Sequence, residues 1–190
     1  MPHRANKFVT LWQMSVSIRN IELLAPAKDY LSAVDAIDCG ADAVYIGAGR
    51  FGSRYAATNS VEDIAKVVDY AHRFGVKVYA TLNTIIFDSE IEDAKSQAEA
   101  LVAVGVDALI VQDMAYWQMN LPIPLHASTQ LTVHTADALE ELKSLGFSRV
   151  VPSREMSKEE LVVFCKRAKE LDIEVEVFIH GALCISMSGQ

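Results

Sequence analysis

The stretch Gly105-Val-Asp-Ala-Leu-Ile-Val-Gln-Asp113 contains the unit from which the fold is built. It begins with a glycine, continues as a short apolar run, and becomes polar where that run ends. Glycine readily takes the left-handed backbone that follows a helix. An apolar run without polar alternation is typical of a strand covered on both faces of a parallel sheet. The stretch therefore predicts a helix end, a buried strand and a polar loop, in that order.

The same unit recurs along the chain from Ile21 onward. Residues that end predicted helices are Gly40, Gly75, Gly105, Gly146 and, in the last unit, Asp172. The predicted strands are Ile21–Ala25, Ala43–Gly47, Val76–Leu82, Ala108–Gln112, Pro124–Ala127, Arg149–Pro152 and Glu174–Ile179. The uneven glycine spacing favours strand–helix units over a solenoid, whose period is stricter.

Helices are predicted between these strands. Ser60-Val-Glu-Asp63 and Ser157-Lys-Glu-Glu160 have the pattern of capping boxes, in which side chains satisfy the first free amides of a helix. Leu161, Phe164 and Ala168 then recur with helical spacing and mark one apolar face. The chain thus alternates strands and helices throughout.

This alternation fits two α/β architectures, a doubly wound open sheet and a (β/α)8 TIM-type barrel. A dinucleotide-binding doubly wound sheet carries a G-x-G-x-x-G motif after its first strand, whereas here only Gly47-Ala-Gly49 follows the second strand. We therefore expect a barrel, truncated after about seven strands. Residues 21–190 are interpreted as the N-terminal part of the catalytic domain, and residues 1–20 as a leader or flexible tail, because their apolar run is too short for a signal peptide.

Composition limits the classes of protein. The net charge of −8 argues against a broad basic nucleic-acid surface, although a local groove remains compatible with RNA. Cys39, Cys165 and Cys184 are odd in number and far apart, which indicates a reducing, cytoplasmic setting without disulfides. Cys39 and Cys165 are interpreted as inert packing thiols. No apolar run is long enough for a membrane helix.

Polar residues follow the predicted strands, and in a barrel the C-terminal strand ends form the active-site face. The candidate substrate-binding residues there are Arg50, Arg54, Asn83, Gln130, Arg154 and Glu155. Arginine binds carboxylate or phosphate through two parallel hydrogen bonds. Other interpretations stay open: an ion pair of Arg154 with Glu155 or Asp113, a buried hydrogen-bond network for Asn83 and Gln130, and turn capping by Asp113, Ser128 and Thr129.

The end of the chain contains the most reactive side chains. The predicted strand from Glu174 leads into His180-Gly181, followed by Cys184 and Ser188-Gly189. On a helical turn His180 and Cys184 would share a face, a spacing that suits a metal or a thiolate–imidazole pair. We expect both to be catalytic and Cys184 to be a metal ligand; a purely structural histidine is the alternative. Motifs of zinc proteases, serine hydrolases and phosphate loops are absent from the sequence.

Several motifs together resemble one family. They are Glu22-Leu-Leu-Ala-Pro-Ala27, Gly40-Ala-Asp-Ala-Val-Tyr-Ile-Gly47, Thr81-Leu-Asn-Thr84, Gly105–Asp113, His126-Ala-Ser-Thr-Gln130, Ser153-Arg-Glu155, Glu176-Val-Phe-Ile-His-Gly-Ala-Leu-Cys184 and Ser188-Gly-Gln190. From about Ile21 to Gln190 the chain is similar to the collagenase-like peptidases, family U32, of unknown catalytic type. The segment that ends at Cys184 resembles the signature of that family.

The resemblance implies a barrel-like catalytic domain and two kinds of activity. Some members are labelled proteases, that is hydrolases, with reported collagen-degrading activity. Other branches hydroxylate transfer RNA, ribosomal RNA or the ubiquinone ring without molecular oxygen, and hold an iron–sulfur cluster on four cysteines; the RNA branches are linked to prephenate. Cys184 matches the first cluster cysteine, and the others would follow Gln190. We therefore expect this chain alone to be inactive.

Three hypotheses follow for function. Iron–sulfur-dependent hydroxylation of RNA is preferred, because a thiol at a barrel mouth is a natural cluster ligand and no protease constellation accompanies it. The alternative is a peptidase that uses Cys184 as nucleophile and His180 as base, or a metal. The third is a fragment that only binds a partner. Expected partners are RNA or peptide, with prephenate as a further ligand, and self-association through open barrel edges.

Overall fold

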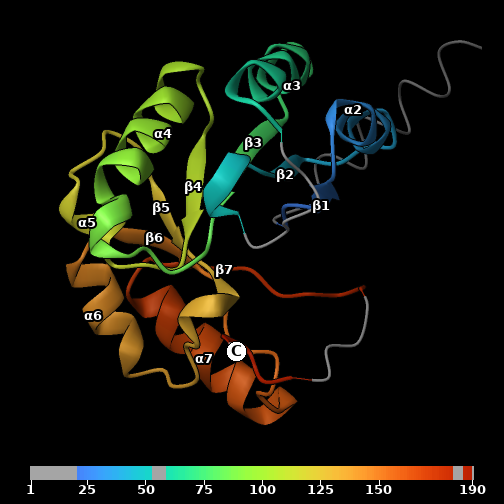
Figure 1. Cartoon of the computed structure of the whole chain (residues 1–190). Helices are drawn as coiled ribbons and strands as arrows, with labels where there is room; N and C mark the ends of the chain where they lie inside the picture. The colour runs from blue at the N-terminus through green and yellow to red at the C-terminus, as the bar shows by residue number, and fades with distance from the viewer. Residues whose placement is uncertain (1–20, 53–58, 182–185, 190) are drawn as a thin grey trace, which may run out of the picture.

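The computed structural model describes residues 21–52, 59–181 and 186–189. Within them a single sheet of seven parallel strands curls as half of a barrel (Figure 1). The strands are β1 Leu24–Ala27, β2 Ala43–Gly47, β3 Lys77–Leu82, β4 Ala108–Val111, β5 Leu125–Ala127, β6 Phe147–Val150 and β7 Glu174–Val175. Their order in the sheet is their order in the chain. A doubly wound sheet would reverse its strand order at a switch point, so the barrel-type α/β architecture is confirmed.

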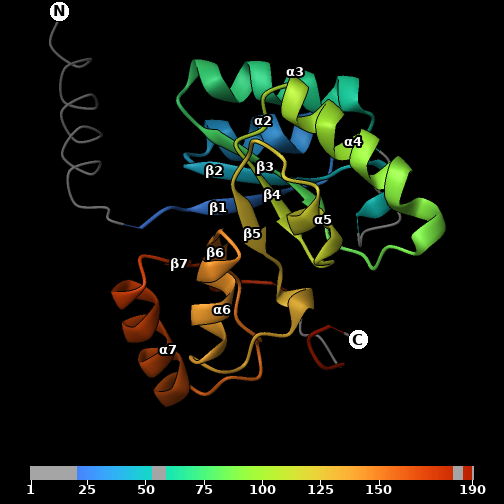
Figure 2. The ribbon, with the colours of Figure 1, turned by 90° about the vertical axis from the view of Figure 1, so that its left-hand side faces the viewer.

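Helices connect the strands. They are α2 Tyr30–Asp38, α3 Val61–Arg73, α4 Ile91–Ala103, α5 Ala115–Gln118, α6 Ala138–Ser144 and α7 Lys158–Glu170, with 3-10 turns η1 Gly49–Phe51, η2 Asp88–Glu90 and η3 Thr129–Leu131. Figure 2 shows α2, α3 and α4 over the first half of the sheet and α6 and α7 over the second. Among the described helices none is long and apolar enough to cross a membrane.

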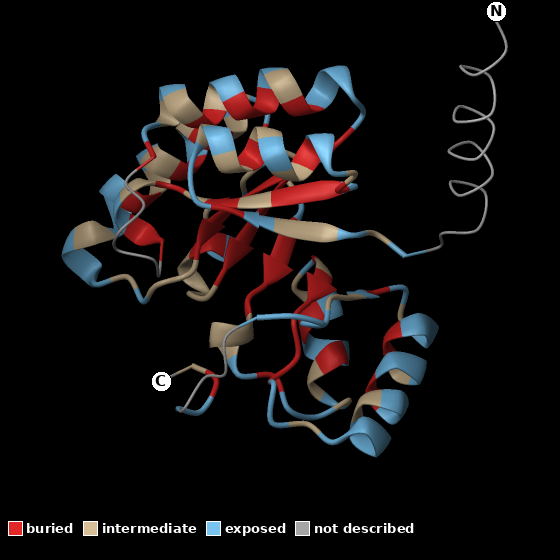
Figure 3. Cartoon of the chain, turned by 90° about the vertical axis from the view of Figure 1, so that its right-hand side faces the viewer, coloured by how far each residue is buried: buried red, intermediate tan, exposed pale blue. Residues whose placement is uncertain are grey.

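The main core lies between the helices and the outer face of the sheet. Ile46, Leu82, Leu101 and Phe164 are fully buried there, and the buried stripe of each long helix faces the strands (Figure 3). A smaller apolar cluster on the other face of the sheet includes Tyr79 and Ile110. Both faces of the central strands are therefore covered, which explains their continuous apolar sequence.

The helix ends follow the sequence signals. Gly40, Gly75, Gly105 and Gly146 all have positive φ, and Asp172 takes the same conformation at φ 53°. Ser157 forms the expected capping box, because its hydroxyl accepts from the amide of Glu160 while its own amide donates to the Glu160 carboxylate. Ser60 forms only half of one: its hydroxyl accepts from the amide of Asp63 and donates to the shorter carboxylate of that residue.

The last strand is shorter than the sequence predicts. Ala43–Gly47 is as expected, but the strand predicted over Glu174–Ile179 ends at Val175. β6 ends at Val150, and the amide of Glu176 makes the last bond, to the Val150 carbonyl. Beyond it the chain has no neighbouring strand on β6, and Ile179 is 84% exposed. Within the described sheet β1 and β7 are the edge strands; self-association through them stays a prediction.

Candidate active site at the C-terminal ends of the strands

Polar side chains from three parts of the chain meet beyond the C-terminal ends of β3 and β5. The amide of Asn83 donates to the hydroxyl of Ser128 over 3.4 Å, which joins the loop after β3 to the loop after β5. The hydroxyl of Thr129 donates to that of Ser188 over 3.5 Å. Figure 2 shows residues 186–189, in red, beside the loop after β5. Residues 83, 128–132 and 188 thus form one polar cluster, here called the mouth cluster.

Ser188 lies at the centre of the mouth cluster and is only 1% exposed. Its hydroxyl accepts hydrogen bonds from both the amide and Nε of Arg154, each at 3.3 Å. Its own amide donates to Oε1 of Glu155 at 2.7 Å, and its carbonyl accepts from the hydroxyl of Thr132 at 3.1 Å. The bond from the Ser188 amide lowers the pKa of Glu155. The segment around Ser188 is therefore fastened to the loops after both β5 and β6.

Gly189 shows how closely this segment is seated. Its φ is +87°, and a Cβ at this position would overlap the hydroxyl of Thr132 and lie 2.9 Å from the carbonyl oxygen of Gln130. A side chain would meet both backbone strain and a steric clash. Glycine at 189 is thus required by the packing.

The two arginines that the structure describes among the candidates differ in their surroundings. Arg50 is 59% exposed, and its two terminal nitrogens are bound by Glu90 at 2.6 Å and Asp93 at 3.1 Å. Arg154 pairs with neither Glu155 nor Asp113 through a short ion pair; its Nε binds Ser188 instead. Arg54 lies outside the described residues.

The remaining candidates at the strand ends serve partly as turn caps. The carboxylate of Asp113 accepts from the amides of Ile86 and Ala115, both at 2.9 Å, so the capping interpretation of Asp113 is confirmed. The hydroxyl of Ser128 likewise accepts from the amide of Gln130 at 3.2 Å. Gln130 is half-buried on η3 and contributes its backbone to the mouth cluster.

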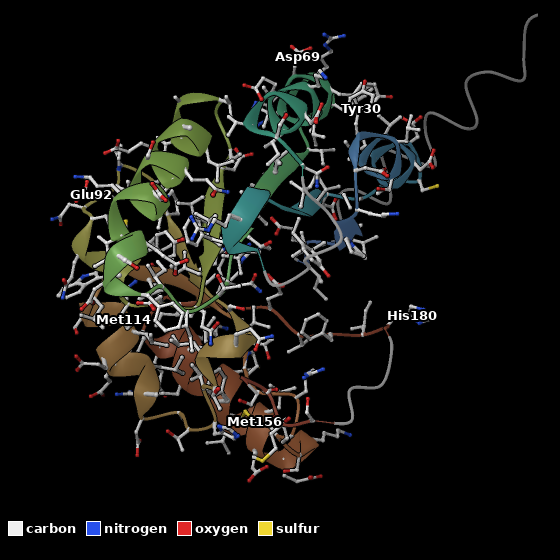
Figure 4. All side chains as sticks on the ribbon, in the orientation of Figure 1. Tyr30, Asp69, Glu92, Met114, Met156 and His180 are labelled. Atoms are coloured by element: carbon white, nitrogen blue, oxygen red, sulfur yellow. The ribbon has the colours of Figure 1, made fainter. Side chains whose placement is uncertain are left out.

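His180 makes no described contact with the mouth cluster. It is exposed at the end of the segment that leaves β7, and its imidazole points away from the ribbon (Figure 4). It makes no hydrogen bond or ion pair within the part of the chain that the structure describes. Cys184, its expected partner, lies outside the described residues, so the pairing of the two stays a prediction.

The described residues contain no set of side chains that could bind a metal ion or an iron–sulfur cluster. Among them no group of three or more His, Cys, Asp or Glu side chains could hold a metal ion. Cys39 and Cys165 are exposed, so their interpretation as packing thiols is wrong: each lies at or near the outer face of a helix rather than toward the core. Neither thiol contributes to the mouth cluster.

A second polar cluster, which the sequence reasoning missed, lies against the inner face of the curled sheet and centres on Arg149 of β6. Its guanidinium binds Glu22 at 2.7 Å and Glu174 at 2.8 and 2.5 Å. It also lies 5.0 Å from the ring centroid of Tyr79, whose hydroxyl donates to both carboxylate oxygens of Glu22. The Arg149 side chain is only 7% exposed. This inner cluster links the chain before β1 with β3, β6 and β7.

Two members of the inner cluster have strongly shifted acid–base properties. Burial raises the pKa of Glu176 to about 7, against an opposing effect of Arg149. Nη1 of Arg149 lies 3.7 Å from Oε2 of Glu176, which is too long for a hydrogen bond, and this oxygen is buried without a hydrogen-bond partner. Burial and the charge of Arg149 lower the pKa of His126 to about 3, and Nδ1 of His126 is also buried without a partner. Glu176 is thus partly protonated at neutral pH, and His126 is neutral.

A sequence signal for the inner cluster does exist. Tyr79, His126 and Arg149 are polar interruptions inside otherwise apolar strands. A polar residue within a buried strand needs a partner. That His126 lies beside Arg149 depends on how β5 and β6 are aligned, and this alignment shifts between Leu125 and His126. The sequence does not show this shift.

Comparison with known proteins agrees with these observations. The model of peptidase family U32 matches residues 28–190. The chain belongs to this family. It is 46% identical to a 23S rRNA 5-hydroxycytidine synthase of Escherichia coli, over 93% of this chain and 27% of that protein. It is 36% identical to a tRNA hydroxylation protein of Bacillus subtilis, over 89% and 40%, and 30% identical to a collagenase of Porphyromonas gingivalis, over 92% and 45%.

Solved structures support the fold. A U32 peptidase structure aligns with a TM-score of 0.64 at 14% identity, over 84% of this chain and 69% of the other. A dihydrodipicolinate synthase from Agrobacterium tumefaciens aligns with a TM-score of 0.60 at 15% identity, over 82% and 63%. At such low identity these matches show the fold alone. The chain spans between about a quarter and a half of the length of the curated relatives named above.

Proposed function

We propose that the full-length protein hydroxylates a base of ribosomal or transfer RNA in the cytoplasm. The observation that carries this proposal is the 46% identity to the 23S rRNA 5-hydroxycytidine synthase over 178 residues. The identity extends over 93% of this chain. The tRNA hydroxylation proteins among the relatives support the same class of substrate.

The mouth cluster supports a role in binding and orienting substrate. Its Ser188 holds Arg154, whose terminal nitrogens lie beyond the strand ends, where barrel enzymes hold their substrates, while the bond from Asn83 to Ser128 joins two of the loops there. Prephenate is proposed as a further ligand on the family resemblance alone. Asp113, whose carboxylate accepts the amides of Ile86 and Ala115, is assigned a structural role that holds the loops after β3 and β4 together.

An iron–sulfur cluster with Cys184 as one ligand is part of the proposal and rests on the family resemblance. Cysteine thiolates are the usual ligands of such clusters, which supply redox chemistry. The described residues contain no set of donors for a cluster. For the described residues the proposed role is to hold substrate.

The test uses full-length protein purified without oxygen. We expect bound iron and acid-labile sulfide, a visible absorption band, and loss of both in Cys184→Ser. RNA from cells that lack the protein should lack one hydroxylated nucleoside by mass spectrometry, and the wild-type protein should restore it while Cys184→Ser should not. Unchanged RNA from the deletion strain would refute the proposed substrate class.

A peptidase is the second candidate, favoured by the collagenase relative and the family name. In this case Cys184 would act as nucleophile and His180 as base or metal ligand. A colourless, iron-free protein that cleaves a collagen-derived peptide, with activity lost in Cys184→Ser and His180→Ala, would establish this function. Because His180 is exposed and without a described partner, substrate or further residues would have to orient it.

A further inference from the structure

The guanidinium of Arg154 is hydrogen-bonded through Nε, while its two terminal nitrogens point to no described partner. Its amide and Nε both donate to the hydroxyl of Ser188, each at 3.3 Å. In the residues that the structure describes, neither of its terminal nitrogens has a hydrogen-bond or ion-pair partner. Arg154 is also exposed. The two terminal nitrogens therefore remain available to an anionic ligand from solvent.

Ser188 cannot easily shift away from Arg154. It is 1% exposed, its amide is bound by Glu155, and its carbonyl is bound by Thr132. The next residue, Gly189, has no room for a side chain. The hydroxyl that holds Nε of Arg154 is thus fixed by several contacts that do not involve the guanidinium. An arginine held in this way loses less side-chain entropy when it binds a ligand.

The carboxylate of Glu155, the next residue in the sequence, already accepts a hydrogen bond from Ser188. Oε1 of Glu155 accepts the Ser188 amide at 2.7 Å, and this bond lowers the pKa of Glu155 more than any other contact does. By contrast, both terminal nitrogens of Arg50 are neutralised by Glu90 and Asp93. Of these two arginines at strand ends, Arg154 is the one whose terminal nitrogens are not bound by carboxylates within the described residues.

We propose that Arg154 binds one phosphate group of the RNA and that Ser188 is the positioning residue that orients its guanidinium. This inference rests on the proposed function. Arginine matches a phosphate through two parallel hydrogen bonds. An exposed guanidinium can reach a backbone phosphate of a long RNA strand. Small-molecule ligands, by contrast, are usually enclosed in concave sites.

The experiment measures how RNA affinity depends on salt. Full-length protein is titrated into a labelled single-stranded RNA at several salt concentrations, by fluorescence anisotropy. Each phosphate contact to a single strand contributes about 0.7 to the slope of log affinity against log salt. We expect Arg154→Gln to reduce the slope by about 0.7, and the matched control Arg50→Gln to leave it unchanged. Urea midpoints confirm that both variants fold.

A second pair of variants tests Ser188. Arg154→Lys keeps the charge and is expected to retain the slope with weaker affinity. Ser188→Ala should weaken binding in the wild-type background and have a clearly smaller effect together with Arg154→Lys, because lysine has no Nε for Ser188 to hold and only the backbone amide at 154 keeps its bond to the hydroxyl. Equal weakening by Ser188→Ala in both backgrounds would show a purely structural role and overturn the positioning assignment.

The outcomes separate this inference from the proposed function. Normal RNA binding with an unchanged slope in Arg154→Gln overturns the phosphate contact and leaves the proposed function standing. Absence of RNA binding by the wild-type protein overturns the proposed function, and this inference with it.

Discussion

Replacing Glu176 by glutamine should stabilise the chain at alkaline pH and have little effect at acidic pH. Glutamine has nearly the same shape as glutamic acid but cannot ionise. In the folded chain burial raises the pKa of Glu176 from 4.5 to about 7. Between these two values the folded state holds a proton that the unfolded state has released, so stability falls as pH rises from about 4.5 to about 7. Above that range the loss is complete.

The magnitude follows from the size of the shift. A change from 4.5 to about 7, at about 1.4 kcal/mol per pH unit, corresponds to about 3 kcal/mol. We therefore expect Glu176→Gln to raise the free energy of unfolding by about 3 kcal/mol at pH 8 and by about 1 kcal/mol at pH 5. The main physical cause is burial of the Glu176 carboxyl; the neighbouring charge of Glu22 adds to it, and Arg149 opposes it.

The assay is urea unfolding of the 190-residue chain, followed by circular dichroism at pH 5 and pH 8. His126, whose lowered pKa acts in the opposite direction below about pH 6.5, is present in both proteins and cancels in the difference. Glu141→Gln on the exposed face of α6 is the control, and its effect should stay within about 0.5 kcal/mol. An equal effect of Glu176→Gln at both pH values would refute the reasoning.

Three further predictions concern the stability of the fold and the packing of the segment around Ser188. Arg149→Met should lower the free energy of unfolding by about 3–5 kcal/mol, because Glu22 would lose its buried counterion; urea unfolding at pH 7 tests this, and a neutral effect would contradict it. Gly189→Ala should unseat the segment from Thr132, so that the amide of Ser188 exchanges hydrogen faster in mass-spectrometric measurements; unaltered protection would count against the packing argument. Ser157→Ala should cost about 1 kcal/mol through loss of the α7 cap, measured by urea midpoint, with no change expected for Ser157→Asp.

Much of the fold could be predicted from local patterns. The glycines at 40, 75, 105 and 146, and Asp172, end helices as expected, because positive φ is a local property of the backbone. Ser157 and Glu160 form their cap for the same reason. Strand ends were less accurate: Glu174–Ile179 is apolar enough for a strand, but pairing depends on β6, which stops at Val150.

The site was predicted only in part. The position of polar residues after each strand located the mouth cluster, since parallel strands deliver their C-terminal ends to one face. The partners within it were not predictable: Arg154 binds Ser188, 34 positions away in sequence, and Arg50 is engaged by Glu90 and Asp93. Long, flexible arginine side chains can reach several neighbours, and only their three-dimensional placement selects one.

The amino-acid sequence by itself determined the alternation of strands and helices and the barrel-type order, because periodicity, caps and glycines act over a few residues. The tertiary structure alone decided which charges meet. Arg149 and Glu22 are separated by 127 positions yet bind at 2.7 Å, since curling of the sheet brings β6 opposite the start of β1. The acid–base state of Glu176 and His126 follows from this meeting, because burial and neighbouring charge, rather than residue type, determine a pKa.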